Sequence, residues 1–439
     1  MAKKKQDLTP EERLAAALVP EEEWPYALPD GWKWVRLGKI YDVNPKVQAD
    51  DDLEASFVTM SDISPGIKSQ FDFIVRKWGE IKKGHTQFAN GDVAFAKISP
   101  CFENRKSMIL DGLKNGIGAG TTELIVLRNP SIDNKYTFLF ISSEEFIRHA
   151  RNTYKGVVGQ QRINLDFVKN YPMPLPPLSE QRRLVARIES LFAKLDAAKE
   201  KVQSVLDSHE TRKAALLHDA FAGKLTAKWR EEQGESSHAW RIEKLENLCE
   251  KITCGKTPKN DISPQGEIPY LKVYNIVNDK IDFRSKPQYI SRDVHETKLK
   301  SSILKPNDVI MNIVGPPLRK IAIIPDTYPE WNMNQAIVRF RPKEGLDYHF
   351  LYYALLNPET LDDVVQRTKG VVGQANISIT QSRNLKIKVP PLPEQQEIIR
   401  ILDRLLAREQ RARQAAEETL AAIDRMKQSI LARAFRGEL

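Results

Sequence analysis

Two long stretches of the chain carry apolar residues at alternating steps of four and three, which is the heptad pattern of a coiled coil. The first stripe consists of Leu184, Ile188, Leu191, Leu195, Val202 and Val205. The second stripe consists of Ile398, Leu402, Leu405, Ile423, Met426 and Ile430. Ala198 also belongs to the first stripe, Ala412 and Ala416 belong to the second, and Glu409 and Thr419 interrupt the second. We expect the two helices to pair with each other, because a stripe this narrow is unlike the wider stripe of a helix that packs on its own domain.

The helical stretches belong to a longer segment that occurs twice in the chain. KGVVGQ at residues 155–160 returns at 369–374, and PPLSEQ at 176–181 returns as PPLPEQ at 390–395. Over the 71 residues from 155 to 225, the ungapped match to the second copy has 23 identities. Upstream the halves diverge, although residues 31–40 still resemble 239–248. The sequence therefore predicts an internal repeat, each copy being a variable globular part followed by a similar helical tail.

The globular parts are expected to be mixed α/β. Residues 91–110 and 307–324 alternate like strands around a turn, whereas 136–151 and 348–367 have the pattern of amphipathic helices. An antiparallel pairing of the tails would place the two globular parts at opposite ends of the helix pair. The expected divisions are an N-terminal extension with a short helix at 1–24, a first globular domain at 25–178, a first helical region at 179–227, a linker at 228–239, a second globular domain at 240–392 and a second helical region at 393–439.

Composition narrows the class of protein. The net charge of +9 permits a polyanionic partner without requiring one, and a hydrophobic fraction of 41% excludes a disordered chain. No apolar run approaches the roughly 18 residues that a membrane span needs, and no apolar core follows the basic start. The three cysteines make no disulfide framework. We therefore expect a soluble, cytoplasmic protein that does not contact membranes.

No pattern in the sequence predicts catalysis or a bound metal. GKT at 255–257 lacks the glycine that a phosphate loop needs at position 250, which is Glu250. Cys249 and Cys254 lack a second Cys or His pair at zinc spacing, and no Gly-x-Ser-x-Gly motif is present. Recognition is therefore favoured over reaction, and we expect no catalytic residue, metal or cofactor in this chain.

The repeated starts of the helical tails carry a family resemblance. PLPPLSEQRRLVARIESLFAKLD at 174–196 and VPPLPEQQEIIRILDRLL at 389–406 resemble the specificity (S) subunit of type I restriction–modification enzymes. GDVAFAKISPCFENRKS at 91–107, NDVIMNIVGPP at 307–317 and GWKWVRLG at 31–38 resemble segments of that family's target-recognition domains. The resemblance covers essentially the whole chain, and the doubled Pro-Pro-Leu-x-Glu-Gln motif is its most specific part.

The resemblance implies an α+β protein in which two α/β target-recognition domains are separated by a long antiparallel two-helix coiled coil with an internal pseudo-twofold repeat. Each domain would read one half of a split double-stranded DNA target. The chain itself would be non-catalytic. Two methyltransferase (modification) subunits would methylate adenine with S-adenosylmethionine, and two restriction subunits that use ATP and Mg can join. The alternative is a self-contained DNA methyltransferase–endonuclease whose active site the sequence does not reveal.

Candidate DNA contacts are basic and amide side chains in and near the KGVVGQ segments, because Lys and Arg neutralise phosphates while Arg, Lys, Asn and Gln read base edges. In the first domain we predict Lys97, Arg105, Lys106, Lys155, Gln160, Gln161 and Arg162. In the second domain we predict Arg319, Lys320, Arg367, Lys369, Gln374 and Asn376. The two residues after the shared KGVVGQ differ between the copies, so we expect a common frame with different reading residues. The simpler alternative is a structural turn flanked by solvated charges.

Overall fold

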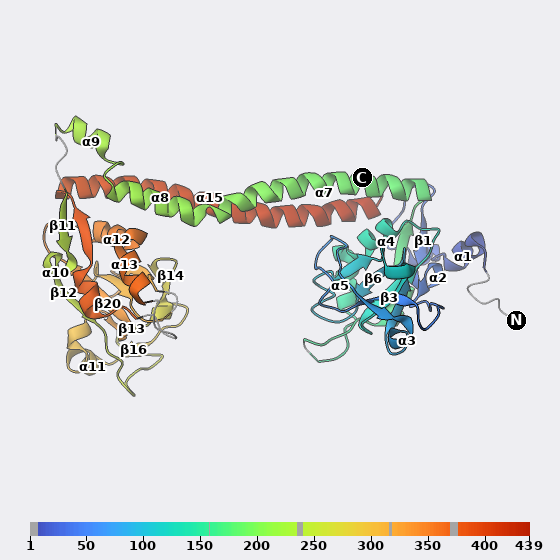
Figure 1. Cartoon of the computed structure of the whole chain (residues 1–439), viewed down its shortest axis with the longest axis horizontal. Helices are drawn as coiled ribbons and strands as arrows, with labels where there is room; N and C mark the ends of the chain where they lie inside the picture. The colour runs from blue at the N-terminus through green and yellow to red at the C-terminus, as the bar shows by residue number, and fades with distance from the viewer. Residues whose placement is uncertain (1–7, 158, 235–239, 316–317, 369–375) are drawn as a thin grey trace. The chain divides into compact units, whose positions relative to one another are not determined.

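The structure is a computed structural model that describes residues 8–157, 159–234, 240–315, 318–368 and 376–439, without the side chains of 363 and 365–368 (Figure 1). The chain forms two compact units. Unit 1 is Met1–Val202 together with Glu418–Leu439, and unit 2 is Gln203–Glu417. Each unit contains one globular lobe and part of the long helices. We call the globular parts lobe 1 (residues 8–177) and lobe 2 (residues 240–391).

Lobe 1 contains two four-stranded sheets and one strand pair. The first sheet has the order β2-β9-β6-β7, which are Asp42–Val43, Leu124–Arg128, Val93–Ala96 and Ser107–Ile109. The second has the order β4-β3-β8-β5, which are Ile74–Lys77, Glu54–Val58, Ile117–Gly120 and Thr86–Ala89, with β3 and β8 parallel. The remaining pair is antiparallel and joins β1 (Lys33–Arg36) to β10 (Pro172–Leu175).

Lobe 1 also contains short helices. They are α1 (Pro10–Ala17), η2 (Glu21–Glu23), α2 (Leu37–Ile40), α3 (Trp78–Ile81), η3 (Lys114–Gly116), α4 (Asn134–Ile141), α5 (Glu144–Arg151) and α6 (Leu165–Asn170). The helical pattern predicted at 136–151 is divided between α4 and α5. Ser143 has an extended backbone, and its hydroxyl accepts the N–H of Phe146, so it caps a new helix.

Lobe 2 repeats the strand order of lobe 1, except that its second sheet has no described strand equivalent to β5. Its first sheet is β12-β20-β17-β18, which are Cys249–Cys254, Ile337–Pro342, Val309–Asn312 and Ile321–Ile323. Its second sheet is β16-β13-β19, which are Tyr289–Ile290, Ile268–Leu271 and Asn332–Met333, with β13 and β19 parallel. Two strand pairs remain, β11 (Arg241–Lys244) with β21 (Lys386–Val389) and β14 (Ile276–Val277) with β15 (Lys280–Ile281). The internal repeat is thus confirmed even where the two sequences have diverged.

The helices of unit 2 outside the long pair are α9 (Ala227–Glu232), α10 (Leu245–Leu248), η4 (Val273–Asn275), α11 (Arg292–Glu296), η5 (Lys300–Ser302), α12 (Tyr348–Leu356), α13 (Pro358–Thr368) and α14 (Ile379–Asn384). The pattern predicted at 348–367 is again two helices. Asn357 has an extended backbone and precedes Pro358, which disfavours helical angles at the residue before it.

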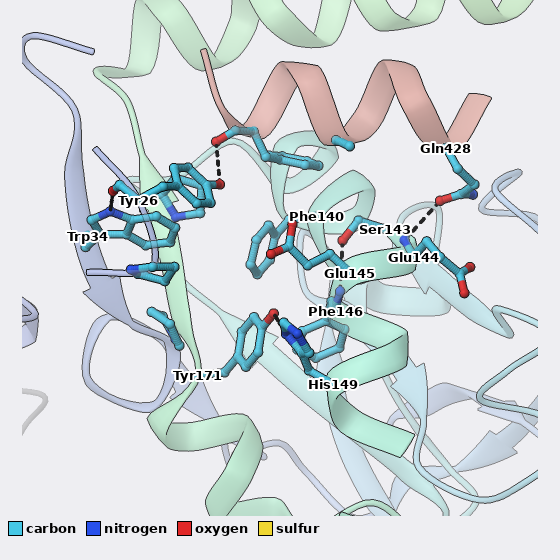
Figure 2. A pocket seen from close by; sticks show the side chains of 15 residues that line it. Tyr26, Trp34, Phe140, Ser143, Glu144, Glu145, Phe146, His149, Tyr171 and Gln428 are labelled. Atoms are coloured by element: carbon cyan, nitrogen blue, oxygen red, sulfur yellow. Dashed lines mark hydrogen bonds between the residues drawn. The ribbon is translucent and has the colours of Figure 1, made fainter. Parts of the chain in front are cut away.

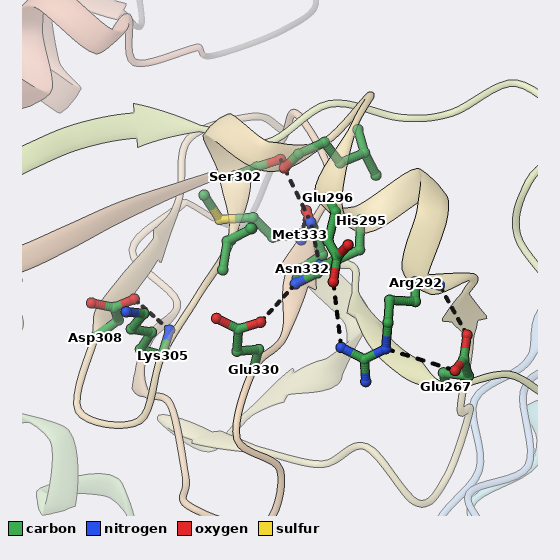
Figure 3. Close-up of polar contacts among 12 residues, drawn as sticks. Glu267, Arg292, His295, Glu296, Ser302, Lys305, Asp308, Glu330, Asn332 and Met333 are labelled. Carbon is green, nitrogen blue, oxygen red and sulfur yellow. Dashed lines mark hydrogen bonds and ion pairs between the residues drawn. The ribbon is translucent and has the colours of Figure 1, made fainter.

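A buried polar network organises the second sheet of lobe 2 (Figure 3). His295 is fully buried, and its Nδ1 lies 3.1 Å from the Asn332 side-chain nitrogen. That amide nitrogen can only donate, so Nδ1 accepts and the proton sits on Nε2, which lies 3.1 Å from a carboxylate oxygen of Glu330. The Asn332 side chain also donates to the Leu299 carbonyl at 3.2 Å. These bonds tie α11 to β19, because burying such groups without partners is costly.

The heptad stripes lie on α7 (Leu178–Asp207), α8 (His209–Phe221) and α15 (Leu392–Phe435). In unit 1, α7 pairs with the last part of α15 through ion pairs of Lys199 with Asp424 (3.0 Å) and Lys427 with Asp196 (2.6 Å). Residue numbers rise along one helix as they fall along the other, so the pairing is antiparallel, as predicted.

In unit 2, α8 pairs with the first part of α15. Glu409, which interrupts the predicted stripe, accepts a 2.7 Å hydrogen bond from Arg212 of α8 and lies 4.0 Å from the buried His209. The interruption is therefore a polar contact between the two helices.

Most predicted stripe residues are shielded. Leu184, Ile188, Ile398, Leu402 and Ile423 are buried, and Leu191, Leu195, Val202, Val205, Leu405 and Ile430 are half-buried. The assignment of Met426 is wrong, because its side chain is 53% exposed. Lys427 lies against α7 instead, with its ammonium 5.0 Å from the Phe192 ring centroid and paired to Asp196. A long Lys side chain can cover apolar surface while its charge finds a partner.

Candidate nucleic-acid interface

The first KGVVGQ segment is attached to the end of β6 by backbone hydrogen bonds. Lys155 and Arg162 exchange two of these bonds, at 3.0 and 2.9 Å. Arg162 forms a further bridge with Ile98, and Ser99 donates to the Gln161 carbonyl at 2.8 Å. Gly156 and Gly159 have φ of +117° and +87°, backbone angles that glycine adopts without strain.

This attachment brings five of the seven candidates of lobe 1 together. We call the set Lys97, Lys155, Gln160, Gln161 and Arg162 the hairpin cluster. Lys155, Gln160 and Arg162 are exposed, whereas Lys97 and Gln161 are half-buried. The cluster offers cations for phosphates and amide or guanidinium groups for base edges on one exposed hairpin.

A carboxylate that the sequence analysis missed organises the cluster. Arg162 donates to Glu123 from Nε at 2.9 Å and from a terminal nitrogen at 2.8 Å. These bonds and the nearby Lys97 hold the pKa of Glu123 below its usual value. The two parallel bonds fix the plane of the Arg162 guanidinium, so any further acceptor would have to compete with Glu123 or bind the remaining edge of the group.

Arg105 and Lys106 are engaged elsewhere within lobe 1. Arg105 donates to the Ser142 carbonyl at 3.0 Å and forms a 2.5 Å ion pair with Glu144. The ammonium of Lys106 donates to the Met60 carbonyl at 2.6 Å. Both side chains therefore help to build the lobe and stand outside the hydrogen bonds of the hairpin cluster.

Lobe 2 reproduces the backbone frame of the hairpin cluster. Val314 bridges to Asn376 as Ile98 bridges to Arg162, and Ile377 donates to the Ile313 carbonyl at 2.9 Å as Ile163 donates to Lys97 at 3.0 Å. Ile313 in turn donates to the Ala336 carbonyl at 2.8 Å, as Lys97 donates to Glu123 at the same distance.

The side chains on this shared frame differ completely between the lobes. Lobe 1 places Lys97, Glu123 and Arg162 at the three equivalent positions. Lobe 2 places Ile313, Ala336 and Asn376 there. One lobe thus presents a charged trio and the other a neutral one on the same backbone frame.

The other candidates of lobe 2 are only partly described. Arg319 pairs with Asp362 at 2.5 Å, and the Lys320 backbone N–H donates to the Asn312 side chain at 2.7 Å, next to β17. Asn376 is exposed. Lys369, Gln374 and the side chain of Arg367 lie outside the described residues, so their role in DNA contact stays a prediction.

One weak signal for Glu123 is its place in the sequence. It stands directly before the apolar run of β9, in the place that Ala336 takes before β20. Because the two halves show almost no identity there, only the shared hydrogen bonds reveal that the positions correspond.

Lobe 1 also carries a pocket of about 190 Å³ with aromatic walls (Figure 2). Tyr26, Trp34, Phe140 and Tyr171 line it, and the Tyr171 hydroxyl lies 2.8 Å from Nδ1 of His149. Burial raises the pKa of the Tyr171 hydroxyl above its ordinary value. The Tyr171 hydroxyl and the His149 imidazole thus form one hydrogen-bonded pair in the pocket wall.

The residues that the structure describes include no group of three or more His, Cys, Asp or Glu side chains arranged to hold a metal ion. In the same residues, no helix combines the length and the apolar character needed to cross a bilayer.

Comparison with known proteins shows which family this chain is similar to. The family model of the type I restriction modification DNA specificity domain matches residues 29–206 and 238–418. The specificity subunit of the type I restriction enzyme EcoAI of Escherichia coli is 44% identical over 202 residues, which are 45% of this chain and 34% of that protein. The matched stretch thus spans about a third of that relative's length.

Solved structures share the fold. A chain from a study of complex assembly and conformational transition in a type I R-M system superposes with a TM-score of 0.75 at 22% identity, covering 94% of this chain and all of that one. The HsdS subunit of Thermoanaerobacter tengcongensis superposes with a TM-score of 0.64 at 21% identity, covering 95% of this chain and all of that one.

Proposed function

This chain belongs to the family of type I restriction modification DNA specificity domains, and we propose that it is the specificity subunit that recognises a split DNA target for such a complex. The observation that carries the proposal is the frame shared by the two lobes. The same backbone bonds support Arg162 with Glu123 in lobe 1 and Asn376 with Ala336 in lobe 2. Two unlike trios on one scaffold suit two unrelated half-sites, one for each lobe.

The paired helices would set the distance between the half-sites. The 44 residues of α15 have a length of about 66 Å at a rise of ~1.5 Å per residue. One turn of duplex DNA is about 34 Å long. A helix pair of this length can serve one lobe at each half-site and leave the base pairs between them unread.

The partners follow from the family. Two methyltransferase subunits would supply S-adenosylmethionine chemistry on adenine, and two restriction subunits would supply ATP- and Mg-dependent translocation and cleavage. This chain would contribute recognition and no catalytic residue, in the cytoplasm where the DNA is. No arrangement among the described residues favours the alternative of a self-contained methyltransferase–endonuclease.

Selection from a random DNA library tests this function. The purified complex of the chain with its methyltransferase subunits should enrich two fixed groups of bases separated by a gap of constant length and variable sequence. Enrichment of one continuous sequence, or of none, would contradict the proposal.

A further inference from the structure

Unit 1 contains a groove of about 700 Å³ between the helix pair and the loop Pro65–Lys68 of lobe 1. Its charged lining consists of the bases Lys68, Arg105, Lys199, Arg425 and Lys427 and the acids Glu144, Asp196 and Asp424. The groove therefore carries two net positive charges. At one end the Gln428 side chain accepts the backbone N–H of Glu144 at 2.9 Å and links α15 to α5 (Figure 2).

Three of the five basic side chains already form ion pairs with acidic side chains inside the groove. The pairs are Lys199 with Asp424 at 3.0 Å, Lys427 with Asp196 at 2.6 Å and Arg105 with Glu144 at 2.5 Å. Lys68 and Arg425 are exposed, and no ion pair or hydrogen bond of their side chains is found among the described residues. Like charges that line one groove repel each other unless an anion lies between them.

In unit 2, the equivalent region is closed by an ion pair between the β14–β15 hairpin and α8. The β14–β15 hairpin corresponds in the fold to the Pro65–Lys68 loop. The hairpin lies in the connection between the antiparallel strands β13 and β16, and the loop lies in the connection between the antiparallel strands β3 and β4. Its turn carries Asp279, which pairs with Lys213 of α8 at 2.6 Å. The Asp279 carbonyl also accepts the Tyr352 hydroxyl at 3.2 Å.

The repeat shows which substitutions separate the two units. At the offset of 214 residues, Lys213 corresponds to Lys427, and Thr211 corresponds to Arg425. Both units thus have a lysine at the first position, and only unit 1 has an arginine at the second. The loop of unit 1 presents Lys68, whereas the hairpin of unit 2 presents Asp279. The region that an ion pair closes in unit 2 is therefore a basic groove in unit 1.

We propose that this groove binds phosphate groups of the DNA backbone in the unread gap beside the first half-site, with Lys68 and Arg425 as the contacts. The inference rests on the proposed function, which supplies a phosphodiester as the anion. The β6–β7 connection contains Lys97 of the hairpin cluster near one end and Arg105 of the groove lining near the other, so one chain segment contributes to both sites. Phosphate contacts hold the register of a protein on DNA and read no sequence.

The salt dependence of DNA binding tests the groove in the full complex with the methyltransferase subunits. Each phosphate contact adds about 0.9 to the slope of log Kd against log salt concentration. The double variant Lys68→Ala with Arg425→Ala should lower that slope by about 1.8 and weaken binding equally for matched and mismatched targets. The matched control, Lys46→Ala with Lys83→Ala, removes two exposed charges of lobe 1 that lie outside the groove, and its slope should not change.

The outcomes separate this inference from the proposed function. If the wild-type complex selects a split target and the groove variant keeps the wild-type slope, the groove proposal is overturned while the function stands. If the variant fails to assemble with the methyltransferase subunits in the absence of DNA, the groove holds an acidic protein segment and the proposal is again overturned. A wild-type complex that selects no split target contradicts the proposed function itself.

Discussion

Phe435 of α15 packs edge-on against Tyr136 of lobe 1, with the ring centroids 5.4 Å apart. Unit 2 has the matching contact, in which Phe221 of α8 packs on Phe350 at 5.2 Å. Phe221 ends the helical tail that follows lobe 1, yet its partner belongs to lobe 2. Each lobe is therefore completed by the tail of the other copy, and neither copy of the repeat contains its whole core.

Truncating these two phenylalanines should destabilise one unit each. Phe435→Ala should lower the free energy of unfolding of unit 1 by about 3–5 kcal/mol, because the ring is buried among aromatic neighbours, and Phe221→Ala should do the same for unit 2. Calorimetry that resolves the two transitions measures the effect. Met426→Ala on the exposed face of α15 is the control and should change stability by less than about 0.5 kcal/mol. Equal losses in all three variants would contradict the exchange.

The glutamines of the repeated Pro-Pro-Leu-x-Glu-Gln motif join each helix to its lobe. The Gln181 side chain accepts the Asp133 N–H and donates to the Pro176 carbonyl, both at 2.9 Å. Gln395 accepts the Asp347 N–H at 2.9 Å and donates to the Pro390 carbonyl at 3.0 Å. The motif was predicted as a helix start, and the structure shows why its last residue is an amide.

Replacing either glutamine should therefore cost stability. Gln181→Ala and Gln395→Ala should each destabilise their own unit by about 1–3 kcal/mol, since each leaves a backbone N–H and a carbonyl buried without a partner. Denaturant unfolding measures the loss. Gln396→Ala, at the exposed neighbouring position, is the matched control and should be nearly neutral. If neither variant changed the free energy of unfolding, water would be replacing the hydrogen bonds of the glutamine amide, and the prediction would be wrong.

The hairpin cluster should govern one half-site only. Replacing Gln160, Gln161 and Arg162 together by Ala should reduce discrimination at the first half-site by about 5- to 150-fold for each base read, because a good base contact contributes about 1–3 kcal/mol. Competition binding with targets mutated in one half at a time provides the measurement. Asn376→Ala is the reciprocal control and should affect only the second half-site. Loss of discrimination in both halves, or in neither, would refute the assignment.

The Arg162–Glu123 contact gives a pH-dependent stability. The folded protein lowers the pKa of the Glu123 carboxyl, so the contact stabilises the fold above the unfolded pKa of about 4.3 and is lost as pH falls through the lower folded value. Wild type should therefore unfold at a higher temperature than Glu123→Gln at pH 6, and the difference should vanish in acid below that lowered pKa. Arg162→Ala should lose the same increment. A difference that persists unchanged into acid would mean that the carboxylate charge has no part in it.

The sequence predicted the features that local pattern decides. The heptad steps from Leu184 to Val205 gave the helices, and the ungapped repeat gave two copies. It misplaced Met426, because periodicity alone does not show that Lys427 covers Phe192 and pairs with Asp196. It also predicted single helical patterns where capping at Ser143 starts a second helix.

Other features depend on contacts between distant segments and left no local signal. The common strand order of the lobes is formed by pairs such as Ser56 with Gly118 and Tyr270 with Asn332, where the sequences do not match. The link of Glu123 to Arg162 joins residues 39 apart in the chain. In lobe 2, Ala336 takes the place of Glu123 and Asn376 takes the place of Arg162. This correspondence can be recognised only from the backbone hydrogen bonds that the two lobes share.

Mapping the methylated adenines in the genome of cells that make the chain with its methyltransferase subunits tests the central claim most directly. The account predicts a split motif with an unread gap of fixed length. Inserting seven residues after Val202 and seven after Glu417 lengthens each helix by about 10.5 Å while preserving the heptad, so the gap should grow by about three base pairs with both half-sites unchanged. A continuous motif, or an insertion that alters the half-sites and leaves the gap as it was, would contradict the account.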